Sequence, residues 1–325
     1  MITIPGFRKL LPFIVIISLL SYKKVYAQSA TTPDLEKRDL PDTILGKRTL
    51  LLPGIFDGQR ALAMLFPGKF YDLSSSAGFK NKFLSWECKT CTPVVYPDVN
   101  GVEDPVGFPY KEGVATRLIN VLDYSDTGGR QYKLVSFNHS VYDEDGQQTG
   151  RFSGGLLGLA KFNLTDSGWR LQAFQPAISA YGAFAQAPAP KLLLIGDNQF
   201  ALMLEHVNGG GGGPFTQDDY LVAGAGGTYH QILSAYGVGR TEGEEKQCSW
   251  TSTYTVTPGG KKYFRDISIT CKGQYWATDS DGLPTELKDK VKGQGKGTFT
   301  ITRVFIYTGK QGYQERLPAS VTIGR

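Results

Sequence analysis

From Val114 to the C-terminus, short runs of β-branched and aromatic residues alternate with clusters of Gly, Asn, Asp and Ser. Examples are "VATRLINVLDY", the turn signal "SDTGG" and "QYKLVSFNHSVY", followed by "LLGLAKFNL", "TDSG" and "WRLQAF". Runs of this kind are typical of strands, and the clusters supply the residues that tight turns require. Their close spacing predicts sequential antiparallel hairpins. We therefore expect an all-β, sandwich-like meander, with a β-propeller-like fold as the alternative.

One short N-terminal helix is expected within this β-rich chain. The stretch "DGQRALAMLF", residues 57–66, begins with a capping residue, Asp57, and ends before the helix-breaking pair Pro67 and Gly68. The composition supports a turn-rich β protein, because the chain has 40 glycines but only 3 methionines and 3 histidines.

Residues 1–27 have the pattern of a signal peptide. Arg8 and Lys9 precede an apolar run at residues 10–20, and "VYA" before Gln28 is a plausible cleavage site. The run is shorter than the ~20 residues that a membrane-spanning helix needs. A short anchor that stays attached is the alternative. We expect a secreted or periplasmic protein whose mature chain has no membrane span.

The mature chain is expected to contain one large domain. Residues 28–50 are polar and proline-containing, which predicts an extended lead-in. Residues 51–325 then form a single β domain, with a possible sub-boundary near residues 240–246.

The charge of the chain argues against nucleic-acid binding. The net charge of +5 falls to +1 when the four basic residues of the signal segment are removed. A nearly neutral protein lacks the basic surface that attracts phosphate backbones. Residues 285–325 keep a local excess of positive charge, which is typical of a lysine-rich strand edge or of a patch that touches an anionic surface.

A hairpin is predicted around the turn "PGG" at residues 258–260. Strands folded symmetrically on this turn bring Cys248 and Cys271 face to face and pair Trp250 with Ile269. One face of the hairpin is then mostly apolar, whereas the other carries alternating threonines. In an oxidising compartment the two cysteines should form a disulfide, worth ~3 kcal/mol of stability.

The other two cysteines, Cys88 and Cys91, lie in the C-x-x-C stretch "WECKTCTP". This spacing occurs in redox dithiols and in half-sites for zinc, but the residues that follow predict an extended loop without an activating helix. With Cys248 and Cys271 already paired, a local structural disulfide between Cys88 and Cys91 is the favoured interpretation.

Two D-x-D-G stretches are candidates for calcium binding. They contain Asp143 and Asp145 in one case and Asp279 and Asp281 in the other. Clustered carboxylates suit calcium, but neither stretch has the spacing of an EF-hand loop. Asp-Gly turns between strands are the simpler explanation, so no metal and no cofactor are expected.

The stretch "HVNGGGGGPFTQDDY" combines five consecutive glycines with three polar residues, His206, Asp218 and Asp219. It lacks the G-K-[ST] sequence and the helix of a phosphate-binding loop. Slack chain between two strands is the favoured interpretation. The alternative is a mobile flap over His206, Asp218 and Asp219, which are then candidate catalytic residues of a secreted hydrolase.

No complete catalytic motif supports an enzyme. The chain has no G-x-S-x-G or H-E-x-x-H sequence, and its only S-x-x-K lies in the signal segment. We therefore expect an exported envelope or secreted protein of bacterial type with a non-enzymatic binding or structural role. Its partner is expected to be a protein or a glycan on a β surface, with the carboxylate-dependent hydrolase as the alternative function.

The signal segment makes the first testable prediction. N-terminal sequencing of the exported protein should begin at or near Gln28, because the cleavage site follows Ala27. An exported protein that retains Met1 would contradict it.

Overall fold

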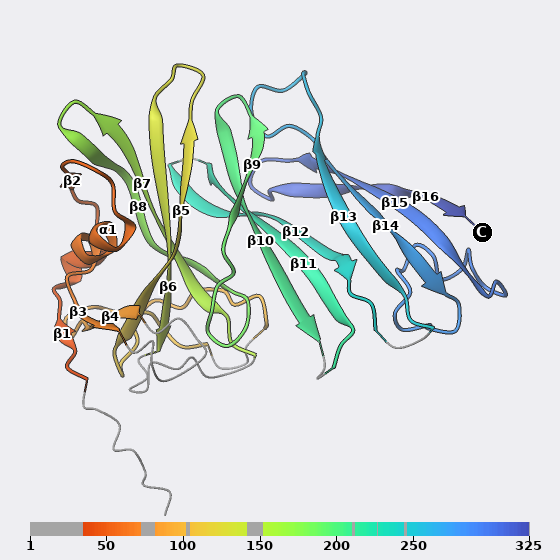
Figure 1. The fold of residues 1–325 in the computed structure, drawn as a ribbon, viewed down its shortest axis with the longest axis horizontal. Helices are drawn as coiled ribbons and strands as arrows, with labels where there is room; N and C mark the ends of the chain where they lie inside the picture. The colour runs from red at the N-terminus through yellow and green to blue at the C-terminus, as the bar shows by residue number, and fades with distance from the viewer. Residues whose placement is uncertain are drawn as a thin grey trace, which may run out of the picture. The chain divides into compact units, whose positions relative to one another are not determined.

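The strands of the protein form two large sheets. The computed structural model describes residues 35–72, 82–101, 105–141, 152–209, 212–225, 227–243 and 246–324. Within them each sheet has eight strands, and there is one α-helix (Figure 1). The expected all-β, sandwich-like fold is confirmed, with two sheets in place of the radial blades of a propeller.

The first sheet has the order β1-β4-β5-β6-β7-β8-β2. Outside this order, β3 pairs antiparallel with β4. Neighbours from β4 to β8 are antiparallel, and the turn signals in the sequence mark their connections. At the β5–β6 turn, the Asp126 carboxylate accepts hydrogen bonds from the N–H groups of Gly128 and Arg130. The strands are β1 (Arg38–Asp39), β2 (Leu51–Leu52), β3 (Lys69–Asp72), β4 (Lys82–Glu87), β5 (Val114–Ser125), β6 (Gln131–Val141), β7 (Gly155–Thr165) and β8 (Gly168–Tyr181).

The second sheet is a continuous meander in which neighbours in the chain are neighbours in the sheet, from β9 to β16. The connection at residues 240–246 lies between two strands of this sheet, β12 and β13, which pair through Arg240 and Trp250. The strands are β9 (Lys191–Gly196), β10 (Gln199–Gly209), β11 (Phe215–Ala225), β12 (Thr228–Arg240), β13 (Ser249–Val256), β14 (Ile267–Trp276), β15 (Lys296–Tyr307) and β16 (Tyr313–Gly324).

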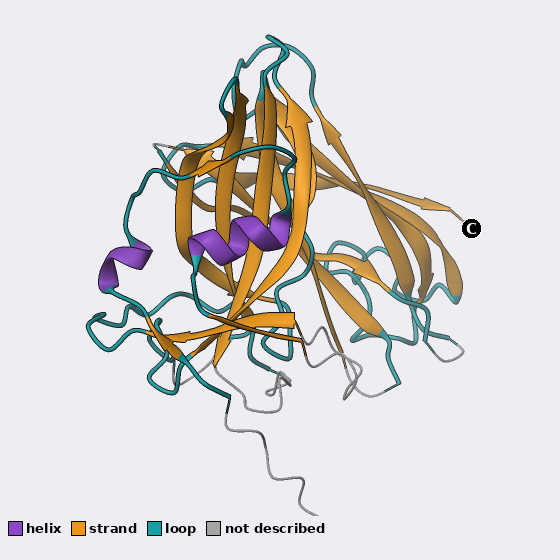
Figure 2. Ribbon diagram, turned by 60° about the vertical axis from the view of Figure 1, so that its left-hand side comes forward, coloured by secondary structure: helices purple, strands orange, loops and turns teal. Residues whose placement is uncertain are grey.

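The predicted helix is present as α1 (Gly58–Leu65). The side chain of Asp57 accepts a hydrogen bond of 2.6 Å from the N–H of Arg60, which caps the first turn. Figure 2 shows α1 lying across the strands of the first sheet. It buries Leu62 and Leu65 in a core that contains Trp86 and other aromatic residues of this sheet. A 3₁₀ turn, η1 (Asp42–Leu45), precedes the helix.

Both sheets bury side chains on two faces. In β6, Val135 contributes to the core beneath α1, whereas its neighbour Leu134 belongs to a core shared with the second sheet. In β11, Leu221 faces a third core and Val222 faces the shared one. Because successive residues of a strand point to opposite faces, the sheets pack on each other through one face each.

The remaining face of the second sheet is covered by the chain between β14 and β15. Leu283, Leu287 and Val291 of this segment are buried in the third core. Two ion pairs tie the segment to the sheet. Asp279 lies 3.3 Å from Arg240, and Glu286 lies 2.6 Å from Arg303.

The predicted register of the hairpin was wrong by four residues. The Cys248–Cys271 disulfide that was predicted from this register was therefore wrong as well. Cys271 lies opposite Ser252, and both Cys248 and Cys271 are free, buried thiols. A four-residue offset separates the two positions by about 13 Å along the strands. The predicted faces are nevertheless correct, because an offset of four preserves the alternation.

The cause of the error is the length of the β13–β14 connection. Gly259 and Gly260 do adopt positive φ angles, but within a longer loop that Thr257 N–H and Asp266 C=O close with a bond of 2.9 Å. Phe264 in this loop stacks on Tyr307 of β15, with ring centroids 3.9 Å apart. The predicted Cys88–Cys91 disulfide is confirmed.

A buried hydrogen-bonded chain crosses the core of the first sheet. Trp86 Nε1 donates to Thr116 Oγ1 at 2.7 Å, and Thr116 Oγ1 lies 2.7 Å from His139 Nδ1. His139 Nε2 lies 3.0 Å from the carbonyl of Pro176. The indole can only donate and the carbonyl can only accept, so Thr116 donates to Nδ1 and Nε2 carries the ring proton. Burial lowers the pKa of His139 to about 3, and the ring is neutral.

Replacing Thr116 with valine should be strongly destabilising. Valine keeps the shape but leaves Trp86 Nε1 and His139 Nδ1 without partners, which should lower the free energy of unfolding by about 2–4 kcal/mol. Thr116→Ser is the matched control, because it keeps the hydroxyl and loses one methyl group, at about 1 kcal/mol. Urea unfolding measures both. Equal losses in the two variants would contradict the assigned chain.

No helix in the described part of the chain has the length and apolar character needed to cross a membrane.

Candidate functional site

The candidate catalytic residues lie on two paired strands, β10 and β11. His206 is directly opposite Asp218, and Glu205 is directly opposite Asp219. Asp218 and Asp219 are consecutive in one strand, so their side chains point to opposite faces of the sheet. The structure therefore does not bring these two carboxylates together as an acid–base pair.

Asp219 is a buried carboxylate with structural partners. It accepts hydrogen bonds of 2.7 Å from the hydroxyl of Tyr254 and 2.8 Å from Nε2 of Gln217. Burial raises the pKa of Asp219 above its ordinary value, although both hydrogen bonds oppose the shift. Through Tyr254 the carboxylate links β11 to β13.

His206 and Asp218 lie on the face directed at the first sheet. Asp218 accepts a hydrogen bond of 2.7 Å from the N–H of Gly237. His206 is buried, and its Nδ1 atom has no hydrogen-bond partner in the part of the chain that the structure describes. Burial lowers the pKa of His206, while the nearby carboxylates of Asp218 and Asp98 act in the opposite direction. Among the described residues, Nδ1 of His206 therefore has no hydrogen-bonded group of the kind that orients a catalytic base.

The glycine stretch connects β10 to β11. The last recorded pair of the two strands is Gly209 with Phe215, and Gly212 and Gly213 have positive φ angles. Residues 210 and 211 lie outside the described residues.

Of the two pairs of calcium-binding candidates, the structure describes one. Asp143 and Asp145 lie outside the described residues. Asp279 accepts hydrogen bonds from the N–H groups of Cys248 and Gly282 and pairs with Arg240, whereas Asp281 is exposed. Among the residues that the structure describes, no group of three or more His, Cys, Asp or Glu side chains is arranged to hold a metal ion.

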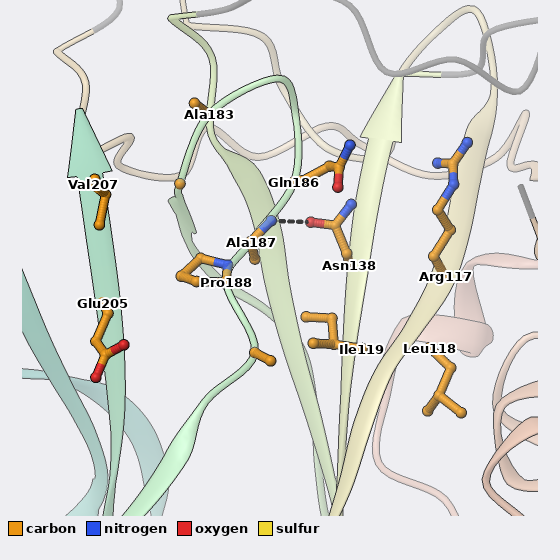
Figure 3. Close-up of a pocket in the computed structure, with 12 residues that line it drawn as sticks. Arg117, Leu118, Ile119, Asn138, Ala183, Gln186, Ala187, Pro188, Glu205 and Val207 are labelled. Carbon is orange, nitrogen blue, oxygen red and sulfur yellow. Dashed lines mark hydrogen bonds between the residues drawn. The ribbon is translucent and has the colours of Figure 1, made fainter. Parts of the chain in front are cut away.

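A cavity of about 390 Å³ lies beside β10, where sequence reasoning had placed no site. Pairing of β9 with β10 ends at Lys191 opposite Met203, whereas β10 continues to Gly209. The chain before β9, residues 182–190, runs away from β10. Figure 3 shows Glu205 and Val207 of β10 on one side of the cavity, and β5 and β6 on the other.

Asn138 of β6 holds the segment 182–190 in place. Its Oδ1 accepts a hydrogen bond of 2.9 Å from Ala187 N–H, and its Nδ2 donates one of 3.0 Å to Ala185 C=O (Figure 3 shows the first). Gly155 makes room for this contact, because a Cβ there would lie 1.8 Å from Asn138 Oδ1. Phe184 and Ala185 have φ angles of 54° and 52°. Such left-handed conformations are unfavourable for residues with a Cβ, and they are concentrated at functional sites.

The walls of the cavity are mixed in character. Leu118, Ile119 and Val207 are apolar. Arg117 donates a hydrogen bond of 2.9 Å to Ser140 Oγ and is nearly buried, while Glu205 forms an ion pair of 2.5 Å with Lys191. Positive and negative groups therefore stand on opposite walls.

Exposed apolar side chains occur on the segments around the cavity. Ala185 N–H donates to Ser153 C=O at 2.8 Å, which places the 183–186 turn beside the 152–154 segment. Phe152 and Phe184 in these segments are exposed, as is nearly half of Val207. Apolar groups left in solvent beside a cavity are typical of a binding surface.

Comparisons of this chain with family models, with curated proteins and with solved structures find no match.

Replacing Asp219 with asparagine should reveal a pH-dependent difference in stability. The raised pKa means that the folded state binds a proton more tightly than the unfolded state. The free energy of unfolding of the wild type should therefore rise relative to that of Asp219→Asn as the pH falls from 7 toward about 4. Each tenfold difference in proton affinity is worth about 1.4 kcal/mol.

Urea unfolding of the two proteins at several pH values measures this difference. A difference between them that stays constant over the pH range would refute the buried, proton-retaining carboxylate.

Proposed function

We propose that the protein is an exported, non-enzymatic binding protein that captures an extended segment of a partner protein on the open edge of β10. The observation that carries the proposal is the early end of β9. The β9 pairing stops at Met203, and from Leu204 onward β10 continues beside a cavity of about 390 Å³.

A strand edge has a specific chemical preference. Alternate N–H and C=O groups on the edge are spaced to pair with another strand, so an unpaired edge is a template for an added one. An extended peptide that follows the line of β9 would run antiparallel to β10 and satisfy these groups. Main-chain hydrogen bonds give such a complex its affinity, whereas side-chain pockets give it selectivity.

The surroundings of the edge suit a peptide with mixed side chains. Ile119 and Val207 offer apolar contact, and Gln186 presents an amide from the loop. Phe184 at the turn adds an exposed aromatic ring. Aromatic anchors of this kind dominate the energy of many protein interfaces.

The conformation of the segment 182–190 also supports a binding role, because the segment is held in a strained conformation and is not a loose connection. Its left-handed residues, Phe184 and Ala185, are held by Asn138 instead of relaxing toward β10. Pro188 and Pro190 lack N–H groups, so they cannot complete a ladder with β10. The sequence thus keeps this edge open. Export is supported by the signal-like N-terminus and by the Cys88–Cys91 disulfide, which suits an oxidising compartment.

The hydrolase alternative has no comparable support, because Asp218 and Asp219 point to opposite faces and each has its own structural partner.

The proposal predicts that filling the cavity abolishes peptide binding. A library of random linear peptides is panned against the wild-type protein, and the enriched peptides are titrated by fluorescence anisotropy. Ala189→Trp should abolish binding, because Ala189 lines the cavity and is exposed at its mouth. Ala63→Trp is the matched control, since Ala63 is exposed on α1.

Hydrogen exchange locates the bound peptide. A peptide that pairs with β10 should slow amide exchange in residues 204–208 of the wild type and leave Ala189→Trp unaffected. Failure to enrich any peptide, equal binding by both tryptophan variants, or binding of glycans alone on an array would overturn the proposal.

A further inference from the structure

A second cavity, of about 250 Å³, lies at the other junction of the two sheets, where β8 meets β12. The amide of Gln175 in β8 joins the strands, because its Nε2 donates to Tyr229 C=O and its Oε1 accepts from Tyr229 N–H, both at 2.7 Å. Lys47 and Arg48, from the chain before β2, form a cationic wall beside this junction.

Arg48 in this wall makes one hydrogen bond and one aromatic contact within the described part of the chain. Its Nη2 donates to the carbonyl of Leu65, and its Cζ lies 4.9 Å from the centre of the Phe174 ring. Its Nε is buried and has no hydrogen-bond partner among the described residues. Burial lowers the pKa of Arg48, which reflects the unfavourable transfer of this charge out of water.

The described residues that line the cavity provide no counter-ion for these two cations. None of the described residues that line it is acidic, and Lys47 and Arg48 form none of the ion pairs recorded in the described part of the chain. Two other enclosed arginines have carboxylate partners. Arg240 lies 3.3 Å from Asp279, and Arg303 lies 2.6 Å from Glu286.

This contrast has a physical consequence. A half-buried guanidinium without a negatively charged partner is destabilising, and an anion that enters the cavity would remove that penalty. Arginine binds oxyanions through paired N–H groups in one plane, and lysine adds a second positive charge. The aromatic rings of Phe174 and Tyr229 provide apolar contact for the rest of a ligand.

We propose that the cavity lined by Lys47, Arg48 and Phe174 is a binding site for a small oxyanion, a carboxylate or a phosphate. Arg48 supplies the directed hydrogen bonds, Lys47 supplies charge at the mouth, and Gln172 supplies an additional amide. The volume is below the ~300–1,000 Å³ of pockets that hold drug-sized ligands, which restricts the ligand to a small molecule. This site is separate from the β10 edge and does not depend on the peptide-binding proposal.

Thermal melting with added anions tests the site. Inorganic phosphate and benzoate are titrated separately into the wild-type protein, with sodium chloride at matched ionic strength as the reference. At least one of the two anions should raise Tm in a saturable manner. The two titrations distinguish a phosphate from a carboxylate ligand. No saturable rise with either anion would overturn the proposal.

Variants assign the effect to the two cations. Arg48→Met should weaken the apparent affinity about tenfold or more, because it removes a charged hydrogen-bond donor and keeps the aliphatic stem. Arg48→Lys should retain part of the affinity. Lys47→Met should weaken binding without loss of fold, since Lys47 is exposed.

Lys310→Met is the matched control, because it removes the same charge from an exposed position outside the cavity. NMR of the wild type should show anion-dependent shifts centred on residues 172–175 and on Tyr229. Affinities that are equal in the control and in both methionine variants at positions 47 and 48 would refute the assignment.

Discussion

The fold depends on the contact between the two sheets. Leu134 and Leu157 of the first sheet belong to the same buried core as Leu204 and Tyr220 of the second. Strands that use one face for this contact still carry apolar residues on the other, so each sheet needs a second cover. Helix α1 covers the first sheet, and the segment between β14 and β15 covers the second. The cavities lie where β9 leaves β10 and where β8 meets β12.

Local patterns predicted the elements and their faces but not the distances between them. The turn residues marked the hairpins, and Asp57 marked the start of the helix, because both signals act within a few residues. The offset between Cys248 and Cys271 depended on the length of one loop. Phe264 of that loop stacks on Tyr307, a contact between residues far apart in the chain that a local pattern does not reveal. Alternation preserved the faces, so the apolar pattern was correct even though the pairing was not.

Local patterns predicted the candidate site less well than they predicted the fold. Proximity in the sequence suggested Asp218 and Asp219 as a pair, yet adjacency in a strand is the arrangement that separates two side chains onto opposite faces. The cavity beside β10 combines residues of β5, β6, the 182–190 segment and β10, which no short motif joins. One signal was present in the sequence. The alternating prolines Pro188 and Pro190 precede β9 and prevent it from pairing along the rest of β10.

The buried ionisable side chains of this protein differ in how their charge is neutralised. Arg240 and Arg303 are enclosed together with a carboxylate, and both hold the segment that covers the second sheet. His139 is kept neutral within a fully bonded chain, so its burial needs no counter-ion. Arg48 differs from both the paired arginines and the neutral histidine. It has aromatic and carbonyl contacts but no negative partner in the described chain. Arg240 and Arg303 are neutralised within the fold, whereas the proposed site leaves the neutralisation of Arg48 to an anion from solution.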